Sequence, residues 1–270
     1  MLPKIGGSSS LLSYIRDDFR METWLLAGAC LQAVGILLLG QRSLIITAVL
    51  LGCQLGAGLL KDQGLFKSNQ SKNVKWGKWT MQFPRRESDA PLQERSPSDE
   101  QIVVFMLASR SNHPRGRFAP GFIVMGKYFG DMWHDLAKNR QTNGFLGRTS
   151  TLMSTDEDCS NTMCWLSYWK DMESLQTFAN GPVHKKGFVW YMKTALKEYP
   201  GIGIMHETYH IPKGHWETIM FNMRPFGLTA TQHFVDDKDA GEKRPVSAVI
   251  EAKGKTWDKM RDRMGTSDSA

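Results

Sequence analysis

The chain has 270 residues, a net charge of +7 and a pI near 9.2. This length suits one good core, or a modest domain with appendages. The basic balance is compatible with nucleic acid, with an anionic membrane surface or with an ordinary solvated surface. The four cysteines show no C-x-x-C spacing and two of them lie in very apolar stretches, which argues against a disulfide framework and a zinc site.

Residues 1–22 are interpreted as a cytosolic N-terminal segment. They contain a Gly-Ser-Ser-Ser run and end in the charged stretch Arg16–Arg20. No small-residue cleavage site separates this charge cluster from the apolar region that follows, so a cleavable signal peptide is not expected.

Two apolar runs follow, at Trp24–Gly40 and Leu44–Leu60, with three residues between them. Each run has 17 residues, the short end of the membrane-spanning range. No polar face interrupts either run, and Gly52 and Gly56 have the spacing that lets membrane helices approach closely. These features predict a transmembrane helical hairpin over residues 23–61, with a buried hairpin of a soluble protein as the alternative.

Basic residues flank this predicted hairpin on both sides. Arg42 is the one basic residue of its turn, whereas the flanks hold Arg16, Arg20, Lys61, Lys67, Lys72, Lys75 and Lys78. By the positive-inside rule, the N-terminus and the long C-terminal portion both face the cytosol. We expect a multi-pass protein of two spans, in the endoplasmic reticulum membrane, with membrane lipid and not nucleic acid as its partner.

Residues 62–100 are interpreted as a basic juxtamembrane segment and a linker. Trp76 and Trp79 suit the headgroup region, although they equally suit the beginning of a globular core. From Pro84 to Glu100 proline and charge dominate and little can be buried, which is typical of a linker.

A globular domain is predicted over residues 101–225. The apolar run Ile102–Leu107 predicts a buried strand that ends in a polar loop, and apolar residues recur at helical spacing from Phe122 to Leu136. Strands are then predicted over 147–154 and 162–169. In the second, alternation places Met163, Trp165, Ser167 and Trp169 on one side, and Cys164, Leu166 and Tyr168 on the other.

Two helical segments and a last strand complete the predicted domain. Asp171 is a suitable N-cap, Gly181-Pro182 breaks the helix, and a second segment runs to about Tyr199. Gly203–His210 reads as a strand, with Trp216–Asn222 as an extension or further strand. The order is β-α-β-β-α-β, an α+β ferredoxin-like arrangement. Residues 226–270 are interpreted as a polar tail, mostly loop, with Lys253–Arg263 as a short-helix candidate.

Motifs for nucleotide cofactors and common hydrolases are absent. The sequence has no P-loop, no glycine fingerprint after a strand, no G-x-S-x-G and no HExxH, so we expect no cofactor. His206, His210 and His215 superficially resemble metal ligands, but strand residues four apart are separated by about 13 Å, and no metal site is predicted. His206, Thr208 and His210 line one face of the last strand, facing either a ligand cavity or solvent at a sheet edge.

Three further residues are candidates for catalysis. His113 lies in the loop after the first strand beside Arg115, which can orient an anionic or carbonyl group, or contact lipid phosphates. His184 lies in the first turn after Pro182, where helix N–H groups favour an anion or enolate-like oxygen. The alternative for such a histidine is a structural hydrogen bond.

Large aromatic residues are frequent in this domain. They often form a core, and they also suit a pocket for a hydrophobic substrate. We expect substrate contacts from Trp133, Trp165, Trp169, His206 and His210.

The domain resembles a known fungal family. The strand order, the loop motif HPxGxxAPGF at His113–Phe122, the strand Trp165–Trp169 with its following helix, and His184 at the next helix start are similar to fungal monooxygenase-like proteins related to the antibiotic-biosynthesis monooxygenases. The resemblance covers about residues 100–225. It implies a ferredoxin-like dimeric α/β barrel, a homodimer with a pocket between sheet and helices, and work in secondary-metabolite pathways as cofactor-independent oxygenases or cyclases.

The sequence supports three hypotheses about function. The first is a membrane-anchored, cofactor-independent monooxygenase that oxidises a hydrophobic polyketide or terpenoid, with His184 or His113 as base and Arg115 orienting the substrate. The second is a cofactor-free cyclase of the pericyclase type, which needs only shape and one or two hydrogen bonds. The third is a non-catalytic membrane scaffold.

Overall fold

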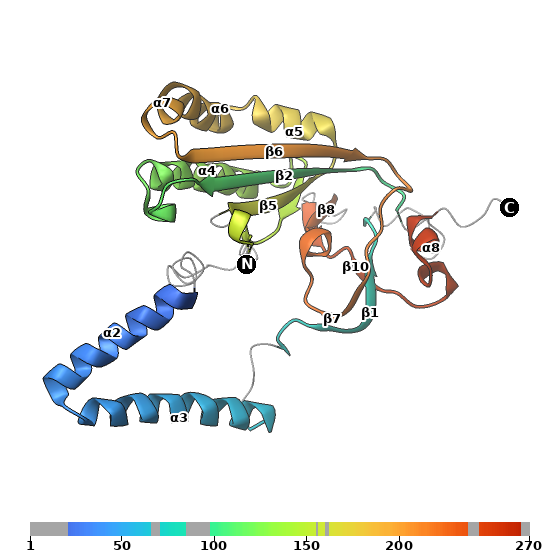
Figure 1. The fold of residues 1–270 in the computed structure, drawn as a ribbon. Coiled ribbons are helices and arrows are strands. Elements are labelled where there is room, and N and C mark those ends of the chain that lie inside the picture. Colours follow the sequence, from blue (N-terminus) through green and yellow to red (C-terminus); the bar gives the residue numbers. More distant parts are fainter. Residues whose placement is uncertain are drawn as a thin grey trace. The chain divides into compact units, whose positions relative to one another are not determined.

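The computed structural model describes residues 21–65, 71–84, 98–154, 156–159, 162–236 and 243–265. The predicted N-terminal segment up to Arg20, much of the linker and parts of the C-terminal tail lie outside these residues. The chain forms two compact units, a helical hairpin that ends before Lys75 and an α/β unit from Lys75 onward (Figure 1). Each unit is described by itself.

The hairpin consists of α2 (Met21–Leu39) and α3 (Arg42–Asp62). Both helices are long and apolar enough to cross a membrane, and almost none of their surface is buried. Their polar side chains pair across the hairpin, because Gln32 Nε2 donates to Ser43 Oγ at 3.0 Å and Thr47 Oγ1 donates to Gln32 Oε1 at 2.5 Å. Such pairing satisfies polar groups that lipid cannot. The prediction of two apolar helices is confirmed.

The two helices approach each other near the turn. A Cβ atom at Gly35 would lie 3.3 Å from the Ser43 Cβ atom, whereas one at Gly52 or Gly56 would meet nothing within 4 Å. The predicted close approach at Gly52 and Gly56 is therefore wrong for the contact within the hairpin. The contact lies at the turn because a three-residue connection brings only that end of the helices together.

The α/β unit contains the predicted β-α-β-β-α-β order. Its elements are β2 (Ile102–Ser111), η3 (Gly116–Phe118), α4 (Phe122–Lys138), β3 (Phe145–Arg148), β4 (Leu152–Met153), η4 (Glu157–Cys159), β5 (Thr162–Trp169), α5 (Met172–Ala179), α6 (Pro182–Trp190), the π-helical turn η5 (Tyr191–Ala195), α7 (Leu196–Glu198) and β6 (Ile202–Ile211). The sheet is antiparallel with strand order β3-β5-β2-β6, and β4 adds to β5. This is the ferredoxin-like arrangement.

Several local predictions are confirmed. Asp171 caps α5, since its Oδ1 accepts a hydrogen bond from the Ser174 N–H at 2.8 Å. The helix breaks at Gly181 and begins again with Pro182 at its first position, where a missing N–H costs nothing. The predicted strand 147–154 is instead two short strands, β3 and β4, separated by residues 149–151.

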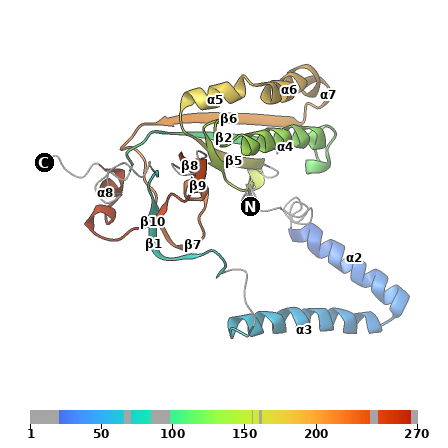
Figure 2. The same cartoon turned by 180° about the vertical axis from the view of Figure 1, so that it is seen from behind.

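One face of the sheet carries the helices (Figure 2). Met163 and Trp165 of β5 pack against Phe122, Met125 and Phe129 of α4, and the Phe129 and Trp165 rings meet edge to face at 5.6 Å. On the opposite face, Tyr168 and Leu166 belong to a different apolar cluster. The predicted alternation of β5 is confirmed, and it fixes which residues lie under the helices.

A second small sheet joins segments from both ends of the domain. It has the order β10-β1-β7, from β1 (Lys75–Met81), β7 (Met220–Met223) and β10 (Val249–Glu251), and β8 (His233–Asp236) pairs separately with β9 (Lys243–Val246). Helical turns η6 (Gly227–Ala230) and η7 (Lys255–Trp257) and helix α8 (Met260–Met264) complete the unit. β1 lies in the predicted juxtamembrane segment and β10 in the predicted polar tail, so both predictions are corrected here. The two strands form because they pair with each other, as at Trp79 and Glu251, and no local pattern reveals so distant a partner.

The two sheets share an apolar cluster. Phe83 and Trp216 pack against Ile102 and Tyr168 on the face of the larger sheet that the helices leave open, and the Phe83 and Trp216 rings meet edge to face at 5.3 Å. The second sheet therefore covers one end of that open face.

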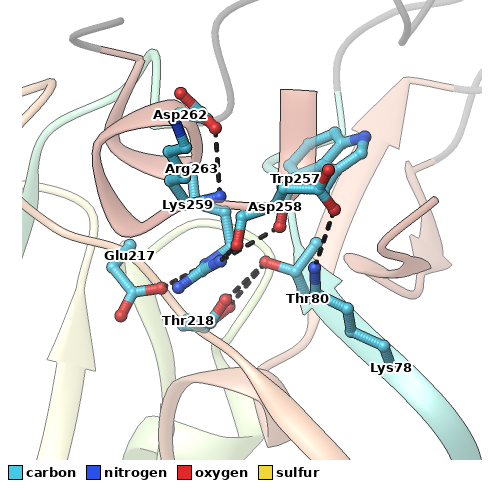
Figure 3. Close-up of polar contacts among 9 residues, drawn as sticks. All are labelled: Lys78, Thr80, Glu217, Thr218, Trp257, Asp258, Lys259, Asp262 and Arg263. Atoms are coloured by element: carbon cyan, nitrogen blue, oxygen red, sulfur yellow. Dashed lines mark hydrogen bonds and ion pairs between the residues drawn. The ribbon is translucent and has the colours of Figure 1, made fainter. Parts of the chain in front are cut away.

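A buried ion pair holds the C-terminal helix in place (Figure 3). Arg263 Nε donates to Glu217 Oε2 at 2.6 Å, and Arg263 Nη1 donates to the carbonyls of Trp257 and Asp258 at 3.0 and 2.9 Å. Nearby, Thr80 Oγ1 of β1 donates to the carbonyl of Thr218 at 2.6 Å. These contacts tie α8 to the segment before β7.

We predict that Arg263→Ala lowers the free energy of unfolding by about 3 kcal/mol, because it leaves a largely buried carboxylate and two carbonyls without their donor. Denaturant unfolding in detergent, followed by far-ultraviolet circular dichroism, measures this. The matched control is Lys253→Ala, which removes an exposed ion pair to Glu251 and should cost less than about 1 kcal/mol. Equal losses for the two variants would contradict the assignment.

Candidate functional site

His184 lies in the first turn of α6 and is surrounded by aromatic rings. Its ring lies 5.7 Å from that of Phe178 and 6.4 Å from that of Phe188, the latter nearly parallel at 15°. Pro182 begins the helix two residues earlier and fixes the direction in which this turn leaves α5. The imidazole is half-buried.

The imidazole of His184 lines a cleft of about 380 Å³. The cleft lies between the end of α4 and the α5–α6 junction. Nine of its fourteen lining residues have polar side chains, but apolar atoms supply most of the lining surface. The other lining residues are Asp135, Leu136, Asn139, Thr142, Asn143, Asp171, Glu173, Ser174, Thr177, Phe178, Gly181, Pro182 and Val183. The site was expected between sheet and helices with tryptophan walls, and this cleft differs in both respects.

Most polar groups of the cleft are used by the fold itself. Asn143 donates to the Leu136 carbonyl at 2.9 Å, and Asn139 Nδ2 donates to Asp135 Oδ1 at 3.1 Å. By contrast, the Nδ1 atom of His184 is buried and has no hydrogen-bond partner among the described residues. A buried polar atom without a partner is uncommon, and at the wall of a cleft it is one that a bound molecule can pair with.

Burial lowers the pKa of His184 below its usual value, because desolvation disfavours the imidazolium, and His206 lowers it further by charge repulsion. A weak hydrogen bond with the backbone carbonyl of Ala179 acts in the opposite direction. The net effect keeps the imidazole neutral at pH 7. A neutral imidazole with a free nitrogen can take a proton from a bound molecule.

His206 lies on the helix-bearing face of β6, next to the central strand. Its ring is 5.3 Å from that of Phe105, and Cα register pairs His206 with Leu107. His206, Thr208 and His210 are exposed, and β6 is the edge strand of the sheet. His210 contacts Gln101 at 3.1 Å. The row was predicted to face either a ligand cavity or solvent at a sheet edge. In the single chain it faces solvent.

His113 and Arg115 lie at another place in the domain. Both residues follow Ser111, the last residue of β2, whereas His206 pairs with Leu107 near the middle of that strand. The four residue steps from Leu107 to Ser111 span about 13 Å along the sheet. The Nδ1 atom of His113 accepts a hydrogen bond from the Arg115 N–H at 3.1 Å, and the Arg115 side chain is exposed. The structure thus brings His184 and His206 near each other and leaves His113 and Arg115 apart from them.

The three predicted tryptophans lie mainly in the core. Trp169 and Trp165 are 1% and 7% exposed, and neither lines the His184 cleft. Trp165 Nε1 donates to Thr151 Oγ1 at 3.0 Å. Trp133 is half-buried, with the Arg148 guanidinium 5.0 Å from its ring centre. Their predicted contact with a substrate stays a prediction.

A buried polar cluster at the back of the domain was missed from sequence. Arg140 Nη1 donates to Gln232 Oε1 at 2.7 Å, and His233 Nε2 contacts Thr231 Oγ1 at 2.9 Å. Burial, with Arg140 nearby, lowers the pKa of His233 to about 4. The contacts of these residues are internal to the fold, and that of Arg140 links the turn after α4 to the residue before β8. No local pattern predicts them, because their partners are about ninety residues apart in the chain.

Among the described residues, no three His, Cys, Asp or Glu side chains lie close enough to hold one metal ion. The site offers a neutral imidazole, a second histidine within electrostatic range of it, and aromatic rings next to each.

Comparisons with known proteins place this domain. Residues 102–228 match the family model described as Monooxygenase af470-like, which confirms the predicted resemblance. Monooxygenase af470 of Aspergillus fumigatus is 27% identical over 266 residues, covering 97% of this chain and 93% of that protein. The similarity therefore extends beyond the α/β domain to the apolar helices.

Two solved structures are similar at low identity. An aldoxime dehydratase in complex with butyraldoxime has a TM-score of 0.40 and 14% identity over 71% of this chain, which spans only 44% of that protein. SnoaB, a cofactor-independent oxygenase of Streptomyces nogalater, has a TM-score of 0.27 and 20% identity, covering 40% of this chain and 90% of that protein. Neither likeness is close enough to carry an argument about function.

Proposed function

We propose that this chain, whose domain belongs to the Monooxygenase af470-like family, is a membrane-anchored monooxygenase that works without flavin, haem or metal. The observation that carries the proposal is His184, a half-buried imidazole at the wall of a cleft whose Nδ1 has no well-formed hydrogen bond and whose pKa burial lowers. The named relative supports the same class of reaction.

In the proposed reaction His184 removes a proton from an activated carbon of the substrate. The electron-rich carbanion that results transfers electrons to O2 and forms a carbon–oxygen bond, giving a peroxide. Loss of water from that peroxide leaves a carbonyl, so a CH2 group and O2 become C=O and H2O. The protein supplies the base and the orientation, and the substrate itself supplies the electrons.

The base is assigned to His184 rather than to His113. The Nδ1 atom of His113 already accepts a hydrogen bond from the loop backbone, whereas that of His184 has no partner among the described residues. No chemical role is proposed for His206, whose charge would oppose protonation of His184. No chemical role is proposed for Arg115, which lies in an exposed loop away from the cleft.

A hydrophobic, polyketide- or terpenoid-like substrate is proposed from the surroundings of His184. Phe105, Phe178 and Phe188 supply aromatic surface near the two histidines, while the polar lining suits hydroxyl or carbonyl groups of the same molecule. Two helices long enough to span a bilayer support a protein that meets its substrate at a membrane. We further propose the endoplasmic reticulum, with the α/β domain in the cytosol.

We also propose that a second copy of the chain covers the open face of the larger sheet. That face carries exposed Met205 and Tyr209 on β6 and half-buried Met106 on β2. A two-fold pairing of sheet faces would bury these side chains in both copies.

The dimer is tested by light scattering of the detergent-solubilised chain. We predict a dimer, and a monomer for the double variant Met205→Glu with Tyr209→Glu, because like charges would face each other across the two-fold axis. Lys213→Glu, at an exposed site off this face, should stay dimeric. A monomeric parent chain would contradict the proposal.

The oxygenase proposal is tested with anthrone, an apolar ketone whose CH2 proton is acidic. With ¹⁸O2 we predict a quinone that carries one ¹⁸O atom, and a loss of turnover of about 10²-fold or more in His184→Ala. The control is His134→Ala, an exposed histidine of α4, which should keep full activity.

Other outcomes would point elsewhere. Turnover that survives strict anaerobiosis with unchanged substrate mass would favour the cyclase. A chain that neither binds nor converts such ketones would favour the scaffold, and unchanged turnover in His184→Ala would contradict the assignment of the base.

A further inference from the structure

The α6–η5–α7 segment presents an apolar stripe to the outside of the domain. Phe188, Val189, Met192 and Leu196 are 54%, 45%, 48% and 47% exposed. We call these four residues the apolar stripe. Large apolar side chains that gather on one surface, unlike scattered ones, mark an interaction site.

The stripe belongs to a helix whose other face is fully used. Gly187 packs so closely on α4 that a Cβ atom there would lie 3.2 Å from Met132, and the rings of Tyr128 and Trp190 are 5.1 Å apart. Tyr191 Oη donates to the Ile202 carbonyl at 3.0 Å, and Ala195 is fully buried. The stripe is therefore a second apolar face that the core does not need.

The π-helical turn helps to align the stripe. In an α-helix, residues four apart drift around the axis by about 40° per step. A π-helical turn has more residues per turn and opposes this drift. Since η5 covers Met192, it keeps that residue in line with Phe188 before it and Leu196 after it.

The stripe is continuous with apolar residues of the neighbouring helix. Ile123 and Val124 at the start of α4 are 74% and 42% exposed. Gly121, just before them, lies against Tyr199 at the end of α7, so the start of α4 is beside the end of the stripe. The apolar surface thus spans two adjacent helices.

Lysines surround this surface. Lys185, Lys186, Lys193 and Lys197 are exposed on the same segment, and Lys127 is exposed on α4. Between Pro182 and Tyr199 the sequence has one acidic residue, Glu198. An apolar helix face bordered by lysines is typical of helices that lie in the plane of a membrane surface.

We propose that this surface of the α/β domain rests on an anionic bilayer. The stripe would enter the boundary between headgroups and acyl chains, and the lysines would contact lipid phosphates. A second copy of the chain is a poorer occupant, because two lysine-bordered stripes would repel each other. The surface is separate from the open sheet face and from the hairpin, and the inference does not depend on the reaction assigned to His184.

The test uses the full chain in vesicles of phosphatidylcholine, with and without phosphatidylserine. The photo-crosslinking residue benzoylphenylalanine replaces Met192 in one variant and Lys213, at an exposed site away from the stripe, in another. We predict lipid adducts at position 192 that exceed those at position 213 by at least about fivefold with phosphatidylserine present. Because every variant keeps the same hairpin, differences in adducts between the variants report the surface of the α/β domain.

Charge supplies the second arm of the experiment. Changing Lys185, Lys186, Lys193 and Lys197 to Gln should lower the lipid adducts at position 192 by at least about fivefold, and raised salt should lower them in the unchanged chain. The matched control changes four exposed lysines elsewhere, Lys170, Lys213, Lys253 and Lys255, and should leave the adducts as they were.

Three results would overturn the proposal. They are equal lipid adducts at positions 192 and 213, adducts to protein instead of lipid at position 192, and lipid adducts that respond neither to phosphatidylserine nor to salt. Because the salt arm needs no lysine substitution, the last result is decisive even where a quadruple variant folds poorly.

Discussion

The pairing of β2 with both of its neighbours is the constraint on which the rest of the domain depends. From Val103 to Arg110 this strand pairs with β5, and from Ile102 to Ser111 with β6. Since side chains alternate along a strand, this register decides which residues lie under the helices and which face away. It places His206 beside Phe105 on the helix side, and thereby next to the turn that carries His184.

The two faces and the outer helix surface give the domain three different environments. On the helix side, burial keeps His184 neutral at the wall of a cleft. The opposite face is partly covered by the second sheet through Phe83 and Trp216, and otherwise exposes apolar side chains such as Tyr209. The outside of the helix layer carries the apolar stripe around Met192. Association is thus proposed for a separate surface, whereas the stripe proposed for membrane contact meets the surroundings of His184 at Phe188.

Sequence alone predicts the parts of this fold that rest on local patterns. The helical spacing of α4, the alternation in β5 and the Asp171 cap are each encoded within a few residues. The second sheet is not, because Trp79 finds its partner near the other end of the chain and the strands β7 and β10 have only four and three residues. The site was predicted in part, since the sequence indicated His184 at a helix start. The nearness of His184 to His206 could not be predicted without the register of β2 with β6. The burial of Trp169 could not be predicted without knowing how the core packs.

The pH dependence of kcat/KM tests most directly whether a neutral His184 is the base. Burial lowers the pKa of His184 below its usual value near 6.5, so the neutral form predominates at pH 7. The value of kcat/KM should therefore rise with pH through a midpoint below about 6.5 and then level off, and this rise should be absent in His184→Gln. A midpoint above about 6.5, or the same limb in His184→Gln, would contradict the account.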